Sequence, residues 1–339
     1  MPLLSVSHLS VEFHTPRGLL RAVDDVSFAI EPGEILGLVG ESGVGKTVAC
    51  RALVRLLPGR NGRISSGRVD FAGRDIVRLP EEELRHYRGR QIALLFQDPG
   101  SQLDPILNVG DQLAEMILLQ EGFDPATAAR QAAALLEQVG IDEPARLMGA
   151  YPYQLGPGLL RRVAIAQALA ASPRLLIADE PTKGLDPGVQ AQILRLLLDL
   201  RDRRGLAVIM ISQDLGVVSQ LCDSAAVMYA GRIVERAPKG DLLNRPLHPY
   251  SEALAQCLPG VAPASVPLHE IAGEPLAAGE VIPGCRFHPR CPLYAEKRDP
   301  ICTTTAPLLA PFADGPPDHR AACHYAGPPG APRRQTLKT

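Results

Sequence analysis

The chain has 339 residues, of which 46% are hydrophobic and 21% charged, and its formal net charge at pH 7 is −2. This length and composition predict a globular protein with one large core and a smaller second domain. The small net charge provides no global basic field for phosphates, which excludes nucleic acid as an expected partner. No stretch approaches about 18 uninterrupted apolar residues, and the N-terminus lacks an export signal, so we expect neither a membrane span nor secretion.

The first thirty residues predict half-buried strands. Their apolar residues recur mostly at every second position, as in a sheet with one covered face. We therefore expect an antiparallel β layer at the start of the fold. The residues that carry this pattern are Leu4, Val6, Leu9, Val11, Phe13, Val26, Phe28 and Ile30.

The central part of the chain predicts an α/β domain with a parallel sheet. Ile35–Val39 is apolar throughout, as expected of a strand covered on both faces, and Leu175–Asp179 and Leu206–Ser212 are similar. These runs alternate with helical stretches such as Val189–Leu200, which is typical of parallel sheets. Residues from about 100 to 171 have a helical pattern, clearest over Ala126–Val139, and predict a helical subdomain.

The composition changes to Pro, Gly and Ala after Leu258, and four of the seven cysteines follow. We therefore predict three parts: a main domain over residues 1–258, a cysteine-rich module over 259–326, and a tail over 327–339. The tail has too little apolar content to order itself.

The segment GESGVGKT, Gly40–Thr47, follows the first apolar strand and precedes a predicted helix over Val48–Leu57. It fits the P-loop pattern in the strand–loop–helix context that this motif requires. We expect loop N–H groups and the helix N-terminus to bind phosphates, Lys46 to reach the β and γ oxygens, and Thr47 to ligate Mg²⁺. The alternative is a Gly-rich turn that merely caps a helix. The predicted nucleotide-binding residues of the loop are Gly40, Ser42, Gly43, Gly45, Lys46 and Thr47.

An acidic pair ends the strand over Leu175–Asp179 in the motif LLIADE. We expect Asp179 to hold the Mg²⁺ shell and Glu180 to orient or deprotonate an attacking water. An acidic pair at a strand end also serves as a helix cap, but the P-loop upstream favours a site for ATP hydrolysis.

These motifs, in this order, resemble those of the ATP-binding subunits of ABC transporters, and the resemblance covers nearly the whole chain. It implies a RecA-like parallel sheet core, an N-terminal antiparallel layer and a helical subdomain. Gln97 in LLFQDP matches the Q-loop, which senses Mg²⁺ and the γ-phosphate, and Asp186 in GLDP matches the D-loop. Gln213 stands where the family has its switch histidine. Phe13 matches the aromatic residue that stacks on adenine, and it fits a core strand residue equally well.

Further motifs look like the oligopeptide/dipeptide importer branch of this family, whose members also serve nickel and antimicrobial peptides. They are FQDP, LLIADEPT, VQAQIL, HPY at His248–Tyr250, and GCRFHPRCP in the cysteine-rich module. The resemblance implies a second ATPase subunit, two transmembrane permease subunits and, indirectly, an extracytoplasmic solute-binding protein as partners. It places the chain at the cytoplasmic face of the bacterial inner membrane. The transported substrate is not specified by this chain.

The signature segment departs from the family pattern. In this family each ATP lies between the P-loop of one subunit and the signature, usually LSGGQ or LSGGM, of another. Here Gly156 replaces the serine and Pro157 the first glycine, which removes a hydroxyl and a backbone donor. Each lost charge-assisted hydrogen bond is worth about 1.5–3 kcal/mol. Because proline is tolerated in a first helical turn, we still expect the helix, with Gly156 and Gly158 near the nucleotide.

Gln213 is the second departure, because a glutamine can donate to the γ-phosphate but cannot become cationic. With Glu180, Gln97 and Gln213 as the catalytic set, we expect reduced hydrolysis at this P-loop and pairing with a non-identical ATPase subunit. The alternatives are neutral variation with normal hydrolysis, a mainly non-hydrolysing ATP-sensing subunit, and a soluble ABC protein. The single cassette and the absence of heptads disfavour the last one.

Four cysteines of the C-terminal module predict a metal centre, although their spacing is not the paired CxxC of common zinc sites. Four-cysteine ligation suits Zn²⁺ or a 4Fe-4S cluster, and the resemblance favours the cluster. Four free thiols are the alternative. The predicted ligands are Cys285, Cys291, Cys302 and Cys323. Buried apolar roles are expected for Cys50, Cys222 and Cys257, and surface positions for His288, His319 and His324.

Overall fold

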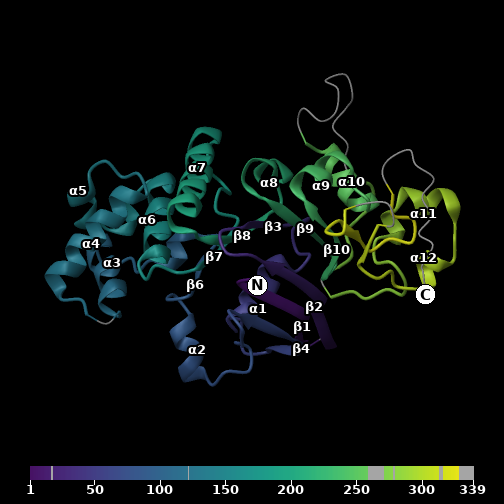
Figure 1. The fold of residues 1–339 in the computed structure, drawn as a ribbon, viewed down its shortest axis with the longest axis horizontal. Coiled ribbons are helices and arrows are strands. Elements are labelled where there is room, and N and C mark those ends of the chain that lie inside the picture. The colour runs from purple at the N-terminus through teal and green to yellow at the C-terminus, as the bar shows by residue number, and fades with distance from the viewer. Residues whose placement is uncertain (17, 121, 259–270, 278, 313–315, 328–339) are drawn as a thin grey trace. The chain divides into compact units, whose positions relative to one another are not determined.

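The computed structural model describes residues 1–16, 18–120, 122–258, 271–277, 279–312 and 316–327 (Figure 1). The chain forms two compact units, which we describe separately. The first unit comprises Met1–Ile30, Ile35–Arg78 and Ser212–Thr339, and the second comprises Glu31–Glu34 and Leu79–Ile211. The predicted start of the cysteine-rich module at residue 259, and its predicted tail beyond residue 327, lie outside the described residues.

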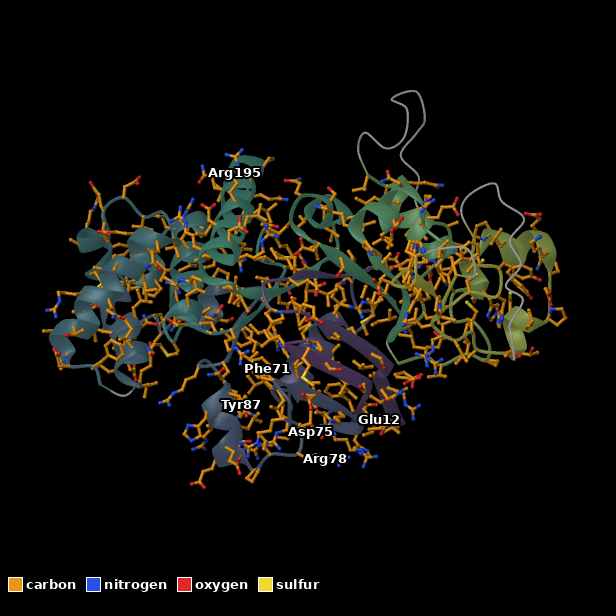
Figure 2. The ribbon with its side chains drawn as sticks, in the orientation of Figure 1. Glu12, Phe71, Asp75, Arg78, Tyr87 and Arg195 are labelled. Carbon is orange, nitrogen blue, oxygen red and sulfur yellow. The ribbon has the colours of Figure 1, made fainter. Side chains whose placement is uncertain are left out.

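An antiparallel sheet opens the first unit, as the alternating pattern predicts. Its strands, in the order β2-β1-β4-β5, are β2 (Gly18–Ile30), β1 (Leu4–Thr15), β4 (Gly62–Phe71) and β5 (Arg74–Asp75). The register of β1 shifts between Val6 and Leu9, and His8 between them has a φ of 52°. This bulge keeps both Val6 and Leu9 buried although they are three residues apart. Glu12 and Phe71, labelled in Figure 2, belong to this sheet.

A second set of strands in the first unit has the order β11-β12-β10-β9-β3. Its wholly buried strand β3 pairs in parallel with β9, and the other neighbours are antiparallel. The strands are β3 (Ile35–Val39), β9 (Ser224–Tyr229), β10 (Arg232–Pro238), β11 (Ala310–Pro311) and β12 (Arg320–Ala321). Its helices before residue 258 are α1 (Lys46–Leu53), α8 (Leu215–Leu221), α9 (Lys239–Asn244) and α10 (Pro249–Gln256). Helix α1 ends four residues earlier than predicted, and Arg55 just beyond it has a left-handed φ of 53°.

The second unit combines a parallel sheet with helices. Strands β6 (Ile92–Leu95), β7 (Leu175–Asp179) and β8 (Ala207–Ser212) pair in that order, which confirms the predicted parallel strands. Helices α3, α4, α5 and α6 pack against one another within the predicted helical region. The helices of this unit are α2 (Glu81–Tyr87), α3 (Val109–Leu118), α4 (Pro125–Gln138), α5 (Pro144–Met148), α6 (Pro157–Leu169) and α7 (Pro187–Arg204). Asp124 caps α4 by accepting from the Thr127 N–H, so the helix begins just before the predicted Ala126.

The cysteine-rich segment attaches to the first unit through β12, which pairs with β10. It contains a 3₁₀ turn (His288–Arg290), α11 (Pro292–Lys297) and α12 (Ile301–Thr304). The prediction that His319 is a surface residue is wrong. This histidine is buried, and its Nε2 lies 2.7 Å from the Glu235 carboxylate, which is itself buried in β10. Among the described residues, no helix has the length and apolar character needed to span a membrane.

Candidate functional site

The loop between β3 and α1 has a backbone that only glycine accommodates at several positions. Gly40, Gly43 and Gly45 have φ values of 148°, 80° and 105°, a region that side chains strongly disfavour. A Cβ on Gly40 would lie 2.2 Å from the Met228 carbonyl oxygen, and one on Gly45 would lie 2.4 Å from that of Ala22. The glycines therefore allow this loop to lie against neighbouring backbone.

Lys46 occupies the first position of α1 and is buried, with 5% of its surface exposed. Its Nζ donates to the carbonyl oxygens of Gly40, at 2.7 Å, and Glu41, at 2.8 Å. The ammonium is thus held over the loop, next to the N-terminus of α1, where backbone N–H groups and the helix dipole favour an anion. Thr47 follows it on the first turn and is half-buried.

Two further predicted site residues, Phe13 and Gln213, belong to the first unit together with this loop. Phe13 lies on β1, opposite Leu20 of β2 and Gly62 of β4, and is half-buried. A Cβ on Gly62 would lie 2.6 Å from the Phe13 ring, so the ring covers that glycine. Gln213 is exposed and lies just before Asp214, the N-cap of α8. The contacts of Phe13 with adenine and of Gln213 with the γ-phosphate remain predictions.

The carboxylates of the second unit lie at the end of β7. Asp179 is its last residue and is 6% exposed. Glu180 has a left-handed φ of 46°, and its backbone N–H donates to the Ile211 carbonyl oxygen at 3.0 Å. A left-handed conformation at a non-glycine residue costs about 1–2 kcal/mol, and such residues cluster at functional sites.

Lys183 is a residue of this region that the sequence analysis missed. Its Nζ lies 3.0 Å from the Glu180 carboxylate, whose side chain is only 13% exposed. A glutamate and a lysine three residues apart form an ion pair when they lie on a helix. Residues 181–184 form a turn instead, so this spacing alone did not predict the pair. The predicted general base therefore carries an ammonium partner from its own chain.

The signature segment forms the helix that we expected. Gly156 is the N-cap of α6, with φ −68° and ψ 161°, and Pro157 is its first residue. No side chain caps this N-terminus, since Gly156 has none to offer. Gly158 is half-buried, whereas Gly156 and Pro157 are exposed.

Arg161, a second residue that the sequence analysis missed, joins α6 to the Gln97 segment. It is 2% exposed and donates to the carbonyl oxygens of Phe96, at 3.0 Å, and Gln97, at 2.8 Å. Burial lowers the pKa of its guanidinium. The second unit thus brings the predicted Q-loop next to the signature helix. Asp186, exposed in the same unit, caps α7 by accepting from the Val189 N–H at 3.0 Å.

The four cysteines of the C-terminal segment line one small pocket, together with His248, Phe287, His288 and Tyr294. Burial raises the pKa of Cys285 to about 12, and it also raises the pKa values of Cys302 and Cys323. His288 bonds to the Cys285 carbonyl oxygen at 2.9 Å through Nδ1. Among the described residues, no three Cys, His, Asp or Glu side chains lie close enough together to hold one metal ion.

The comparisons with known proteins agree with this geometry. Residues 23–183 match the family model described as "ABC transporter". An ATP-binding cassette solved as a dimer in a post-hydrolysis state with ADP and Pi superposes with a TM-score of 0.63 at 24% identity, covering 70% of this chain and 98% of that one. A cassette of an ABC transporter complex from Clostridium perfringens gives 0.60 at 27% identity, covering 71% and 90%. The protein is an ABC-type ATP-binding cassette.

The branch of the family follows from two further findings. Residues 234–297 match the model described as "Oligopeptide/dipeptide transporter, C-terminal region". The dipeptide transport ATP-binding protein DppD of Escherichia coli is 40% identical over 96% of this chain and 97% of its own length. The oligopeptide transport ATP-binding protein OppD of Salmonella typhimurium is 44% identical, over 92% and 91%. The chain belongs to the ATP-binding subunits of peptide ABC transporters, so a soluble ABC protein or a mere ATP sensor is not favoured.

Proposed function

We propose that this subunit binds and hydrolyses ATP to drive uptake of peptides or chemically similar solutes. The observation that carries the proposal is the loop over Gly40–Thr47, whose left-handed glycines surround the buried Lys46. The names of the related transport proteins support peptides as the cargo class. Backbone N–H groups of the loop, including those of Ser42 and Gly43, bind phosphate oxygens, and Lys46 neutralises the β and γ phosphates.

Glu180 of the second unit is proposed to orient or deprotonate the attacking water. Gln97 of the second unit and Gln213 of the first unit are proposed to sense the γ-phosphate. The oxygen-bearing side chains of Thr47, Gln97 and Asp179 are of the type that Mg²⁺ prefers and would hold it. The metal would neutralise phosphate charge during the transfer. Phe13 is proposed to stack on the adenine.

We further propose an asymmetric pair with a second, non-identical ATPase subunit. Gly156, Gly158 and the Asp186 loop of this chain would face the nucleotide held by the partner. Because Pro157 has no N–H and Gly156 no hydroxyl, that site loses two donors, while Gln213 slows hydrolysis at the chain's own P-loop. The pair would act on two permease subunits at the cytoplasmic face of the inner membrane, supplied by an extracytoplasmic binding protein.

Reconstitution in lipid vesicles tests both proposals. With permease, binding protein and partner ATPase present, we expect ATP-dependent uptake of a labelled peptide, and Lys46→Ala should abolish it. Uptake that survives Lys46→Ala would contradict the proposed role of the loop. An assembly with two copies of this chain and no other ATPase would contradict the asymmetric pair.

The cysteine pocket is proposed to hold a 4Fe-4S cluster within a module that spans residues 259–326, with Zn²⁺ as the alternative. The support for a sulfur-ligated centre is that four cysteines line one pocket, although no three described Cys, His, Asp or Glu side chains lie close enough together to hold a single metal ion. Such a centre would stabilise a segment too small to bury much apolar surface. Anaerobic purification followed by visible absorption and by iron, sulfide and zinc analysis distinguishes cluster, zinc and free thiols. A spectrum without visible bands and with no bound metal would leave free thiols as the assignment.

A further inference from the structure

Glu41, the second residue of the P-loop, is held at three different groups: its backbone N–H, its carbonyl oxygen and its carboxylate. Its backbone N–H donates to the Tyr250 hydroxyl at 2.8 Å, and its carbonyl oxygen accepts from the Lys46 Nζ. Its carboxylate forms two parallel bonds with Arg290, from NH1 to Oε2 at 2.7 Å and from NH2 to Oε1 at 3.1 Å. Tyr250 and Arg290 both come from the part of the chain beyond β10, so the C-terminal region determines where this loop residue lies.

Arg290 is itself strongly constrained, which makes it a firm support for Glu41. Its side chain is 3% exposed, and its Nε and NH2 donate to the carbonyl oxygens of Ala272, at 3.0 Å, and Ile271, at 3.2 Å. Its guanidinium lies 5.9 Å from the ring centroid of Phe287 and the same distance from that of Tyr229. A planar guanidinium that makes bidentate bonds to a carboxylate gives geometric precision that a lysine cannot reproduce.

Three buried aromatic rings form the surface on which these contacts rest. The ring centroids of Tyr229 and Tyr250 are 4.8 Å apart, and Phe287 lies 5.2 Å from the first and 5.3 Å from the second. All three residues are at most 1% exposed. Phe287 also lines the cysteine pocket, and Cys291 directly follows Arg290. The same small cluster therefore contacts the cysteine pocket and supports the P-loop.

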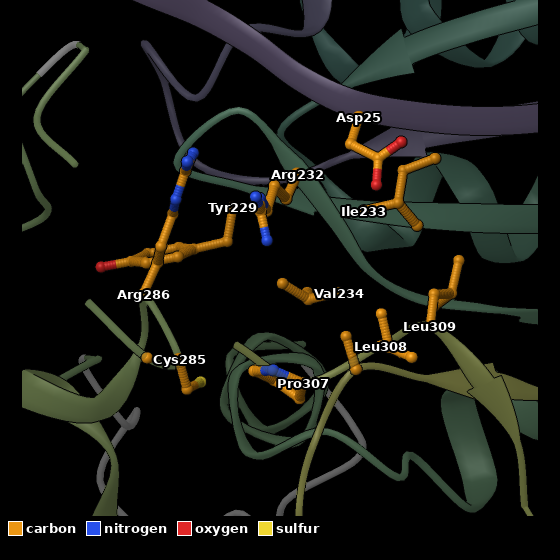
Figure 3. Close-up of a pocket in the computed structure, with 12 residues that line it drawn as sticks. Asp25, Tyr229, Arg232, Ile233, Val234, Cys285, Arg286, Pro307, Leu308 and Leu309 are labelled. Atoms are coloured by element: carbon orange, nitrogen blue, oxygen red, sulfur yellow. The ribbon is translucent and has the colours of Figure 1, made fainter. Parts of the chain in front are cut away.

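The cysteine-rich segment makes a second contact, through Arg286, with the part of the first unit that carries the P-loop. Arg286 pairs with the buried Asp24 of β2 and donates to the carbonyl oxygen of Ala230. Figure 3 shows Arg286, Tyr229 and Arg232 among the residues that line one pocket of this unit. The Asp24 N–H in turn donates to Gly231, and the Gly231 N–H to Val44 of the P-loop. The segment thus reaches the loop by two routes, one at Glu41 and one at Val44.

We propose that Arg290 is a positioning residue for nucleotide binding, which acts through Glu41, and that Tyr250 assists it. The proposal rests on the proposed role of the P-loop. Together the two residues keep the Glu41 carbonyl oxygen, and through it Lys46, in the arrangement that receives the phosphates. The C-terminal segment is then part of the nucleotide site rather than an appendage to it.

A double-mutant cycle on the full-length chain tests this, with the dissociation constant of Mg-ATP as the readout. Arg290→Gln and Glu41→Gln should each weaken ATP binding about tenfold, by the loss of one buried charge-assisted pair. The double variant should bind no more weakly than either single one, because both changes remove the same interaction. Arg298→Gln, an exposed arginine of the same segment, is the matched control and should bind as the parent does.

Several outcomes would overturn the inference. If Arg290 has a purely structural role, Arg290→Gln should lower the Tm and leave the ATP dissociation constant unchanged. If Arg290 and Glu41 act independently, the double variant should weaken ATP binding by the product of the two single effects. If Arg290→Gln does not fold, Arg290→Lys and Tyr250→Phe carry the test, because both keep the buried packing. Unchanged ATP affinity in both would reject the proposal. Failure of the parent to bind ATP, or binding that survives Lys46→Ala, would instead reject the proposed function.

Discussion

The P-loop and the carboxylate segment differ in how their functional groups are held. In the first unit, Lys46 is tied to two loop carbonyls and Glu41 to Tyr250 and Arg290, so the loop is supported from several directions. In the second unit, Glu180 has a left-handed backbone and an ion pair with the half-exposed Lys183. The loop that binds the nucleotide is thus held by buried side chains, whereas the proposed general base is paired with a side chain that reaches solvent.

The largest expected effect separates these two roles. Glu180→Gln should reduce the rate of ATP hydrolysis by about 100- to 1000-fold, because a glutamine cannot act as a general base. ATP affinity should change little, since the phosphates are held by the loop of the first unit. Measured hydrolysis in the reconstituted complex, compared with ATP binding by the isolated chain, checks both parts. If Glu180→Gln also bound ATP much more weakly, the separation of ATP binding and hydrolysis between the two regions would be contradicted.

The rigidity of the loop can be tested at its glycines. Gly45→Ala should destabilise the protein by about 3 kcal/mol and weaken ATP binding, because its Cβ would meet the Ala22 carbonyl oxygen at 2.4 Å. Gly43→Ala is the matched variant, since the φ of Gly43 is also positive but a Cβ there would have no atom within 4 Å. We expect about 1 kcal/mol there, from backbone strain alone. Urea denaturation measures both, and equal losses would contradict the steric explanation.

The support of the loop should weaken in acid. Burial lowers the pKa of His248 to about 3, and its Nδ1 accepts from the Tyr250 N–H at 3.1 Å. Because the unfolded chain binds the proton near pH 6.5 and the folded chain does not, stability is lost as the pH falls below that value. The loss amounts to about 2 kcal/mol between pH 7 and pH 5. His248→Asn keeps an N-cap acceptor without this titration, so its unfolding free energy should vary less over the same range. Identical pH profiles for the two proteins would refute this assignment.

The next change addresses Gln213, a residue of the first unit that is proposed to take part in hydrolysis. Gln213→His restores a group that can become cationic and should raise single-turnover ATP hydrolysis about tenfold, which corresponds to about 1.4 kcal/mol. Gln213→Asn serves as a control that adds no charge. An unchanged single-turnover rate in Gln213→His would exclude slow hydrolysis caused by Gln213.

Lys183→Thr should have the smallest effect. Removal of the ammonium frees the Glu180 carboxylate for water, and we expect hydrolysis to rise at most about fivefold, because half-exposed ion pairs are worth about 1 kcal/mol or less. Lys183→Arg retains the charge and should behave as the parent. Faster hydrolysis in both variants would show that the ion pair is not the cause.

Local patterns in the sequence predicted the elements that depend on short-range chemistry. The apolar runs Ile35–Val39 and Leu175–Asp179 are strands with the predicted limits, and Pro157 starts a helix instead of breaking one. The burial of His319 and the ion pair of Lys183 escaped prediction. A histidine in a Pro-rich stretch carries no signal that a buried glutamate 84 residues away will bond to it.

The sequence by itself determined the class of protein, because the binding and hydrolysis of a triphosphate require glycines at set spacings, a lysine and an acidic pair. It also determined the chemical losses at Gly156, Pro157 and Gln213, since these follow from residue type alone. Only the tertiary structure decided what supports the P-loop. Glu41 and Arg290 are 249 residues apart, and no periodicity or composition connects them. Their pairing is the result of chain packing that buries the aromatic cluster beneath them, which becomes visible only in the folded molecule.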